Sequence, residues 1–180
     1  MGGAGLSTLD GSSDKHLATK YMFWILIFSL IPFPVVFYAN LMSPDSVVLN
    51  FIANKTEALP GMTSIGSPLL SEIMSSYCKL APVFSFIFFM LTYDKLRINT
   101  SLGKAKTFKV LVVFLAFYIV VSYFLLFYDV ELTESKRFLH MMSQTETLLT
   151  LLYCIVFSAI YILTCYLLSF IYAAILIFKK

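Results

Sequence analysis

LPGMTSIGSPLLSEIMSSYCKLAP, residues Leu59 to Pro82, combines a loop and a helix start in one stretch of the chain. Proline, glycine and hydroxyl residues fill its first half, a composition typical of turns. Ser67 and Pro68 then predict the start of a helix, with Ser67 as the N-cap and Pro68 at the first helical position, where no backbone N–H is required. Apolar residues follow at helical spacings, namely Leu69, Leu70, Ile73, Met74, Tyr77 and Leu80.

This helix leads into an apolar run that is too short to cross a membrane alone. The uncharged residues from Leu80 to Tyr93 number about fourteen, whereas a hydrocarbon core of about 30 Å needs roughly 20 helical residues. We therefore expect part of Ile73 to Lys79 to enter the bilayer, with the Lys79 ammonium reaching back to the interface. The resulting span covers about residues 73–93.

The whole chain has the composition of a membrane protein. Of its 180 residues, 59% are hydrophobic and only 13% are charged, against about a quarter charged in soluble domains. Three further apolar runs predict spans at about residues 21–41, 109–128 and 144–178. The predicted fold is all-α, an integral membrane four-helix bundle formed by residues 21–180.

Local sequence features predict irregularities and ends of these helices. Pro32 and Pro34 interrupt the first apolar run and predict a kink there. Ser143 and Glu146 form a capping box at the start of the fourth helix. Residues 47–53 are interpreted as a short amphipathic or interfacial segment between the first two spans.

The distribution of lysine and arginine predicts the orientation in the membrane. Nine of these residues lie in or directly beside the tail of residues 1–20, the loop of residues 94–108 and the C-terminus. Four lie in or beside the loops of residues 42–72 and 129–143. Because cytoplasmic segments carry the excess of positive charge, both termini and the loop of residues 94–108 are expected in the cytoplasm. The tail begins with many glycine and serine residues and is expected to be disordered.

The chain offers little for catalysis, metal binding or ion transport. No ionisable residue lies near the middle of a predicted span, which argues against a transporter or pump. Cys78, Cys154 and Cys165 form no Cys-x-x-Cys pair, and His16 and His140 fall on opposite sides of the membrane, so no catalytic, metal or cofactor site is predicted. Basic residues flank the apolar runs, so nucleic acid is not an expected partner. A small transporter and a structural membrane subunit stay as alternatives.

Several short motifs carry a resemblance to a known family. They consist of Thr56, Glu57, Leu59, Pro60, Thr63, Ser64, Pro68, Leu69, Met74, Tyr77, Cys78, Lys79, Ala81 and Pro82, then Glu131, Leu132 and Thr133, and finally Thr147, Leu148 and Leu149. In these positions the chain resembles the immunity proteins against pore-forming colicins of the A type, the group that includes those for colicins A and B. The similar part runs from about Tyr21 to the end of the chain.

This resemblance implies both a topology and a function. It implies four helices in the bacterial inner membrane with both termini cytoplasmic, as the charges predict, and places the loops of residues 42–72 and 129–143 in the periplasm. It implies that the protein protects the producing cell by binding the pore-forming domain of a cognate colicin in the membrane, so that the channel does not open. No enzyme activity or cofactor is implied, and membrane lipid is the other expected partner. Which colicin is neutralised, and the oligomeric state, stay open.

The resemblance also supplies candidate site residues. Those expected to contact the colicin are Leu59, Pro60, Thr63, Ser64, Pro68, Met74, Tyr77, Lys79, Pro82, Glu131, Leu132 and Thr133. Departures from the family pattern suggest residues that set specificity, namely Gly61, Met62, Glu134, Lys136 and Arg137. The alternative for Pro60, Pro68 and Pro82 is that they only shape the entry to the second helix.

Overall fold

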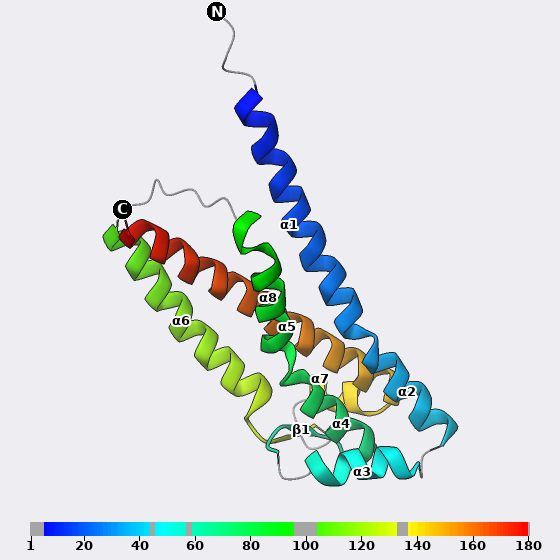
Figure 1. Cartoon of the computed structure of the whole chain (residues 1–180). Coiled ribbons are helices and arrows are strands. Elements are labelled where there is room, and N and C mark those ends of the chain that lie inside the picture. The colour runs from blue at the N-terminus through cyan, green and yellow to red at the C-terminus, as the bar shows by residue number, and fades with distance from the viewer. Residues whose placement is uncertain (1–5, 44–45, 57–58, 96–103, 133–136, 180) are drawn as a thin grey trace, which may run out of the picture.

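The protein is built from long helices packed into a bundle, and the start of the first helix projects beyond the others (Figure 1). The computed structural model describes residues 6–43, 46–56, 59–95, 104–132 and 137–179. Within these residues, 4 helical segments are long and apolar enough to cross a membrane: Thr19–Met42, Pro68–Thr92, Lys104–Leu126 and Glu146–Lys179. The predicted all-α, four-span fold is confirmed, and the protein is a multi-pass membrane protein.

The first span, Thr19–Met42, consists of the second half of α1, Leu6–Leu30, and of α2, Pro32–Met42, with a break at Ile31 between them. Pro32 occupies the first helical position of α2, where its missing N–H leaves no hydrogen bond unmade. The kink predicted from the two prolines is therefore confirmed. The helix begins at Leu6, so the disordered tail expected for residues 1–20 is corrected from that residue onward. Once a helix has nucleated in the apolar run, each further residue adds a backbone hydrogen bond without a new nucleation cost.

The second span is divided into α4, Pro68–Cys78, and α5, Ala81–Thr92, followed by a 3-10 turn at Tyr93–Lys95. The expectation of one helix running straight into the membrane is therefore corrected. Pro82 explains the break, because a proline ring clashes with the carbonyl four residues earlier, which belongs to Cys78, the last residue of α4. Ser67 precedes α4 and Pro68 is its first residue, as predicted, although Ser67 makes no side-chain capping hydrogen bond.

The third and fourth spans differ sharply in how they pack. These spans are α6, Lys104–Leu126, and α8, Glu146–Lys179. α8 contacts α2, α4, α5 and α6 and is the central helix of the bundle. The most apolar window of α8 is 50% buried, whereas that of α6 is 6% buried. α6 therefore lies at the edge, with most of its surface open to the membrane.

α8 begins slightly later than expected. Its first residue is Glu146, and the Thr145 hydroxyl accepts a hydrogen bond from the Leu148 N–H at 3.3 Å. The Glu146 carboxylate accepts a hydrogen bond from the Asn40 amide of α2 at 3.2 Å, a contact across the bundle. The Thr145 hydroxyl therefore caps the first turn of α8, and the capping box predicted for Ser143 and Glu146 stays a prediction.

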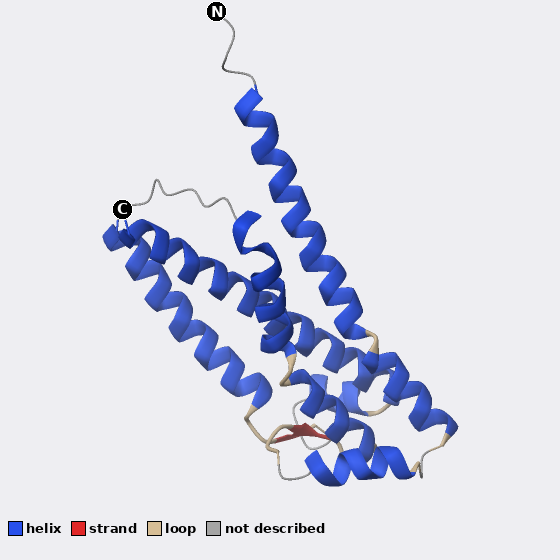
Figure 2. Cartoon of the chain, viewed as in Figure 1, coloured by secondary structure: helices blue, strands red, loops and turns tan. Residues whose placement is uncertain are grey.

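One end of the bundle carries the short elements. α3, Val47–Thr56, lies across this end (Figure 1). Its Leu49 and Ala53 pack against Ile73 of α4. The strands β1, Met62–Thr63, and β2, Val130–Glu131, form a small parallel pair (Figure 2), and α7, Arg137–Ser143, precedes α8. We call this the clasp end. The predicted segment at residues 47–53 is a helix, but the strand pair and α7 were not predicted.

Candidate functional site

The two loops at the clasp end are joined by backbone hydrogen bonds. Met62 is in register with Val130, and Thr63 is in register with Glu131. The Leu132 N–H donates to the Thr63 carbonyl at 2.8 Å. The structure therefore brings together two motifs that the sequence presented separately, one in each loop.

Two carboxylates accept hydrogen bonds across the paired strands β1 and β2. The Asp129 Oδ1 accepts a hydrogen bond from the Gly61 N–H at 2.7 Å. The two oxygens of Glu131 accept one from the Thr63 hydroxyl at 3.1 Å and one from the Ile65 N–H at 3.0 Å. Hydrogen bonds to an ionised acceptor are stronger than neutral ones. We call Gly61, Thr63, Ile65, Asp129 and Glu131 the clasp.

Buried groups anchor the clasp to the bundle. The Tyr153 hydroxyl of α8 donates to the Met62 carbonyl at 2.8 Å, and Tyr153 is fully enclosed. The Ser64 N–H donates to the Ser71 hydroxyl of α4 at 3.1 Å. Leu132 is also buried. The loop is therefore tied to α4 through the Ser64 N–H and to α8 through the Met62 carbonyl, and both backbone groups have protein partners in place of water.

Some of the predicted contact residues lie inside the bundle. Met74 is 1% exposed. The Tyr77 ring stacks on Phe157 with centroids 5.4 Å apart, and its hydroxyl donates to the Ser29 carbonyl at 2.9 Å. In this arrangement both side chains hold α1, α4 and α8 together and offer little surface to a partner.

Other predicted residues are open to a partner. Leu59 is 49% exposed, and Pro60, Thr63 and Pro68 are exposed as well. Ile65, which the sequence did not single out, is 65% exposed and is held by Glu131 through its backbone. The clasp end thus presents apolar side chains on a loop whose backbone is fixed.

α3 adds a second apolar surface at the clasp end that sequence reasoning did not assign to the site. Val47, Val48 and Phe51 point away from its packed side and are among the most exposed large apolar residues of the structure. A short helix with one exposed apolar face is typical of a segment that lies in the membrane interface. Thr133, Glu134 and Lys136 lie outside the described residues, and the Arg137 side chain is not described either.

Lys79 lies at the break between α4 and α5. Its Nζ is enclosed and has no hydrogen-bond partner among the residues that the structure describes. Lys79 therefore lies with its side-chain nitrogen enclosed at this break, and Pro82 positions it by ending α4.

Replacing Glu131 with alanine is expected to loosen the clasp. The Thr63 hydroxyl and Ile65 N–H lose their acceptor, and because both lie near solvent the loss should be roughly 0.5–1.5 kcal/mol for each bond. Glu131→Gln keeps one carbonyl oxygen and should lose less. Hydrogen exchange of the peptide that contains Ile65 measures the effect. Asp94→Ala, at an exposed carboxylate in the turn after α5, is the control, and equal exchange in both variants would contradict the assignment.

Four membrane-spanning helices, with two extramembrane loops joined at one end, define a small multi-pass membrane protein. No group of three metal-binding side chains occurs among the described residues. The sequence profile of the colicin immunity protein family matches residues 45–180. The chain belongs to the colicin immunity protein family, and its function is bacteriocin immunity.

Individual relatives agree with this assignment. The chain is 28% identical to the colicin-A immunity protein of Citrobacter freundii over 84% of this chain and 85% of the relative. It is 28% identical to the colicin-B immunity protein of Escherichia coli over 87% and 90%. It is 31% identical to the colicin-N immunity protein of Escherichia coli over 58% and 81%. No solved structure matches. The resemblance inferred from the motifs is confirmed.

Proposed function

We propose that this protein binds the pore-forming domain of a cognate colicin in the bacterial inner membrane and keeps the toxin channel from opening. The names of its relatives support a colicin as the partner. The observation that carries the proposal is the clasp end, where Leu59 and Ile65 are exposed on a loop fixed by Asp129 and Glu131. A preformed apolar surface binds with a smaller loss of conformational entropy than a flexible loop.

The orientation follows from charge. Lys104, Lys106, Lys109 and Lys179 lie at the other end of α6 and α8, which the positive-inside rule assigns to the cytoplasm together with both termini. The clasp end then faces the periplasm, the side from which a secreted toxin arrives. In this orientation the clasp is the first part of the protein that an inserting colicin meets.

Inhibition needs only preferential binding. A ligand shifts an equilibrium toward the state that it binds better. An immunity protein that binds a closed arrangement of the inserted toxin helices therefore reduces the open fraction. In lipid, helices associate by close packing and by hydrogen bonds between them. Binding of this kind requires neither catalysis nor a cofactor.

A survival assay tests this function. Cells that express the protein should survive one colicin of the A-type group and stay sensitive to pore formers of the other group. Ile65→Ser removes exposed apolar area without touching the Ile65 backbone bond. Burial of such a side chain contributes roughly 1.5–3 kcal/mol, so the protective level should fall about tenfold or more.

The control is Met90→Ser on α5, a substitution of similar size at a residue that is 56% exposed and remote from the clasp. Immunoblots of the membrane fraction establish equal expression. If the protein protects against none of the A-type colicins tested, the proposed function is wrong. Equal loss in the Ile65 and Met90 variants would remove the clasp end from the contact.

A further inference from the structure

α6 has a surface that the immunity function does not explain. It packs on α8 along one side, and only 6% of its apolar window is buried. Bulk lipid can cover a smooth apolar helix without any specific contact. The surface of α6 is hollowed, however, by a groove of about 430 Å³.

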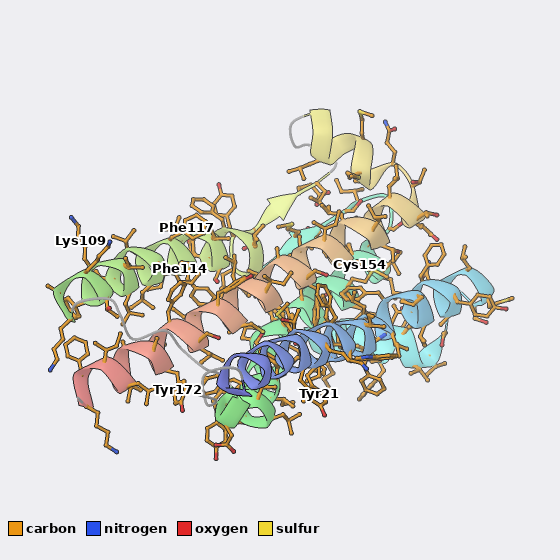
Figure 3. All side chains as sticks on the ribbon, turned by 90° about the horizontal axis from the view of Figure 1, so that it is seen from above. Tyr21, Lys109, Phe114, Phe117, Cys154 and Tyr172 are labelled. Atoms are coloured by element: carbon orange, nitrogen blue, oxygen red, sulfur yellow. The ribbon has the colours of Figure 1, made fainter. Side chains whose placement is uncertain are left out.

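The lining of the groove is apolar, and Lys109 contributes the aliphatic part of its side chain to it. Lys109, Val110, Val113, Phe114 and Phe117 line it, and Figure 3 shows Lys109, Phe114 and Phe117 following one another along α6. Lys109 and Phe117 are eight positions apart, which corresponds to about 12 Å along the helix axis. The groove therefore runs down the helix with the exposed Lys109 at one end, an arrangement that suits a lipid headgroup above an acyl chain.

Aromatic contacts fix the wall of the groove. The Phe114 ring lies 5.2 Å from the Phe170 ring of α8 and 6.4 Å from the Phe117 ring, between centroids. Such contacts restrict the rings to a few orientations. The Phe114 ring, which is part of the groove wall, is thus held against α8.

Positive charge gathers at the mouth of the groove. Phe108 of α6 and Phe178 of α8 are in edge contact at 6.5 Å, which brings the start of α6 beside the end of α8. Exposed lysines from both helices therefore share this end, namely Lys104, Lys106, Lys109 and Lys179. The sequence of α6 contains no acidic residue, and the acidic residue of α8, Glu146, lies at the opposite end of that helix.

The position of these lysines increases the local positive potential. The N-terminus of a helix carries a partial positive charge, so lysines in the first turns of α6 are unfavourable there without an anion. A phosphate group would satisfy both the helix end and the ammonium groups. Charge therefore selects an anionic headgroup over a zwitterionic one.

We propose that the groove on α6 binds one anionic phospholipid. The headgroup phosphate contacts Lys109 and the neighbouring lysines, and an acyl chain lies against Val113 and Phe117. Basic sites beside membrane helices are known to hold anionic lipids in this way. The bound lipid braces α6, which among the membrane helices packs mainly on α8. The proposal does not depend on the toxin.

Native mass spectrometry of the full chain in detergent tests this site. The protein is mixed with phosphatidylglycerol or with phosphatidylcholine of the same chain length. The expected result is retention of one phosphatidylglycerol molecule in preference to phosphatidylcholine. In Lys109→Gln that preference should fall about fivefold, which corresponds to about 1 kcal/mol for one lysine near an anionic lipid.

Three further measurements separate binding in the groove from a general effect of lysine charge and from binding of the headgroup alone. Val113→Trp fills the groove and should reduce retention of both lipids. Lys20→Gln removes an exposed lysine of α1 and should leave retention unchanged. Glycerol phosphate, which carries the headgroup chemistry without acyl chains, should not displace phosphatidylglycerol when the two are present at equal concentration. Equal retention of the two lipids, the same loss in Lys20→Gln as in Lys109→Gln, or full retention in Val113→Trp would each overturn the proposal.

Discussion

Phe157→Ala is expected to lower the free energy of unfolding by about 3–5 kcal/mol, the range for removing a large buried ring. Phe157 is fully enclosed in α8. Its ring contacts Phe33 at 5.6 Å, Tyr77 at 5.4 Å and Phe84 at 6.0 Å, between centroids. It therefore joins α2, α4 and α5 to the central helix. In lipid this loss is one of packing contacts, because the membrane is as apolar as the core.

The buried thiols of Cys78 and Cys165 provide the measurement. A thiol-reactive dye should label them only on unfolding, so heating in detergent gives a transition temperature. Phe86→Ala is the matched control, since Phe86 is 53% exposed on α5 and its loss should change stability by roughly 0.5 kcal/mol or less. If Phe157→Ala and Phe86→Ala unfold at the same temperature, the aromatic cluster around Phe157 does not stabilise the bundle.

The sequence predicts the membrane fold well because lipid imposes strict rules on the backbone. Each spanning segment must be a long apolar helix with its hydrogen bonds made internally. Four such runs can be counted directly, and all four are present. Pro32 and Pro82 both coincide with helix breaks, although only the first break was predicted. Pro32 and Pro82 both lack a backbone N–H donor, so the break before α5 could also have been predicted from Pro82.

The packing order of the helices is not visible in the sequence. α6 and α8 have mean hydropathies of 2.4 and 2.3, yet their buried shares are 6% and 50%. In a soluble protein the more apolar helix is the more buried one. In a membrane both lipid and core are apolar, so hydropathy does not distinguish the central helix from the peripheral one.

The clasp was only partly predictable. Glu131 and Thr63 were identified by resemblance, but their contact joins residues 68 positions apart. Strands of two residues are too short to show an alternating pattern, so nothing local predicts their pairing. Asp129 was not among the residues predicted to contact the colicin. The available clue was the pair of carboxylates at alternate positions, Asp129 and Glu131, together with a turn-rich loop elsewhere in the sequence.

Gly61→Val is expected to disrupt the clasp and reduce protection. Gly61 is buried, and a Cβ added there would overlap the Ser75 hydroxyl of α4. Rotation of the Ser75 side chain relieves the overlap with the added Cβ, but the two methyl groups of valine need further room. We expect them to push β1 away from α4, which strains the bond from Gly61 to Asp129 and the one from Tyr153 to Met62. Overpacking of this kind costs about 1–3 kcal/mol. Thiol labelling during heating measures the loss of stability, and the survival assay measures the loss of protection.

Two variants separate this steric explanation from a role in toxin choice. Ser75→Ala in the Gly61→Val background removes the overlapping hydroxyl and should restore part of the stability. Gly66→Ala is the control, because a Cβ there makes only ordinary contacts at 3.7 Å with Ser143 and Ser64. The sequence suggested that Gly61 sets specificity, whereas its burial predicts that Gly61→Val loses protection against every colicin in parallel with stability. A change in which colicin is neutralised, at an unchanged melting temperature, would instead assign Gly61 to recognition.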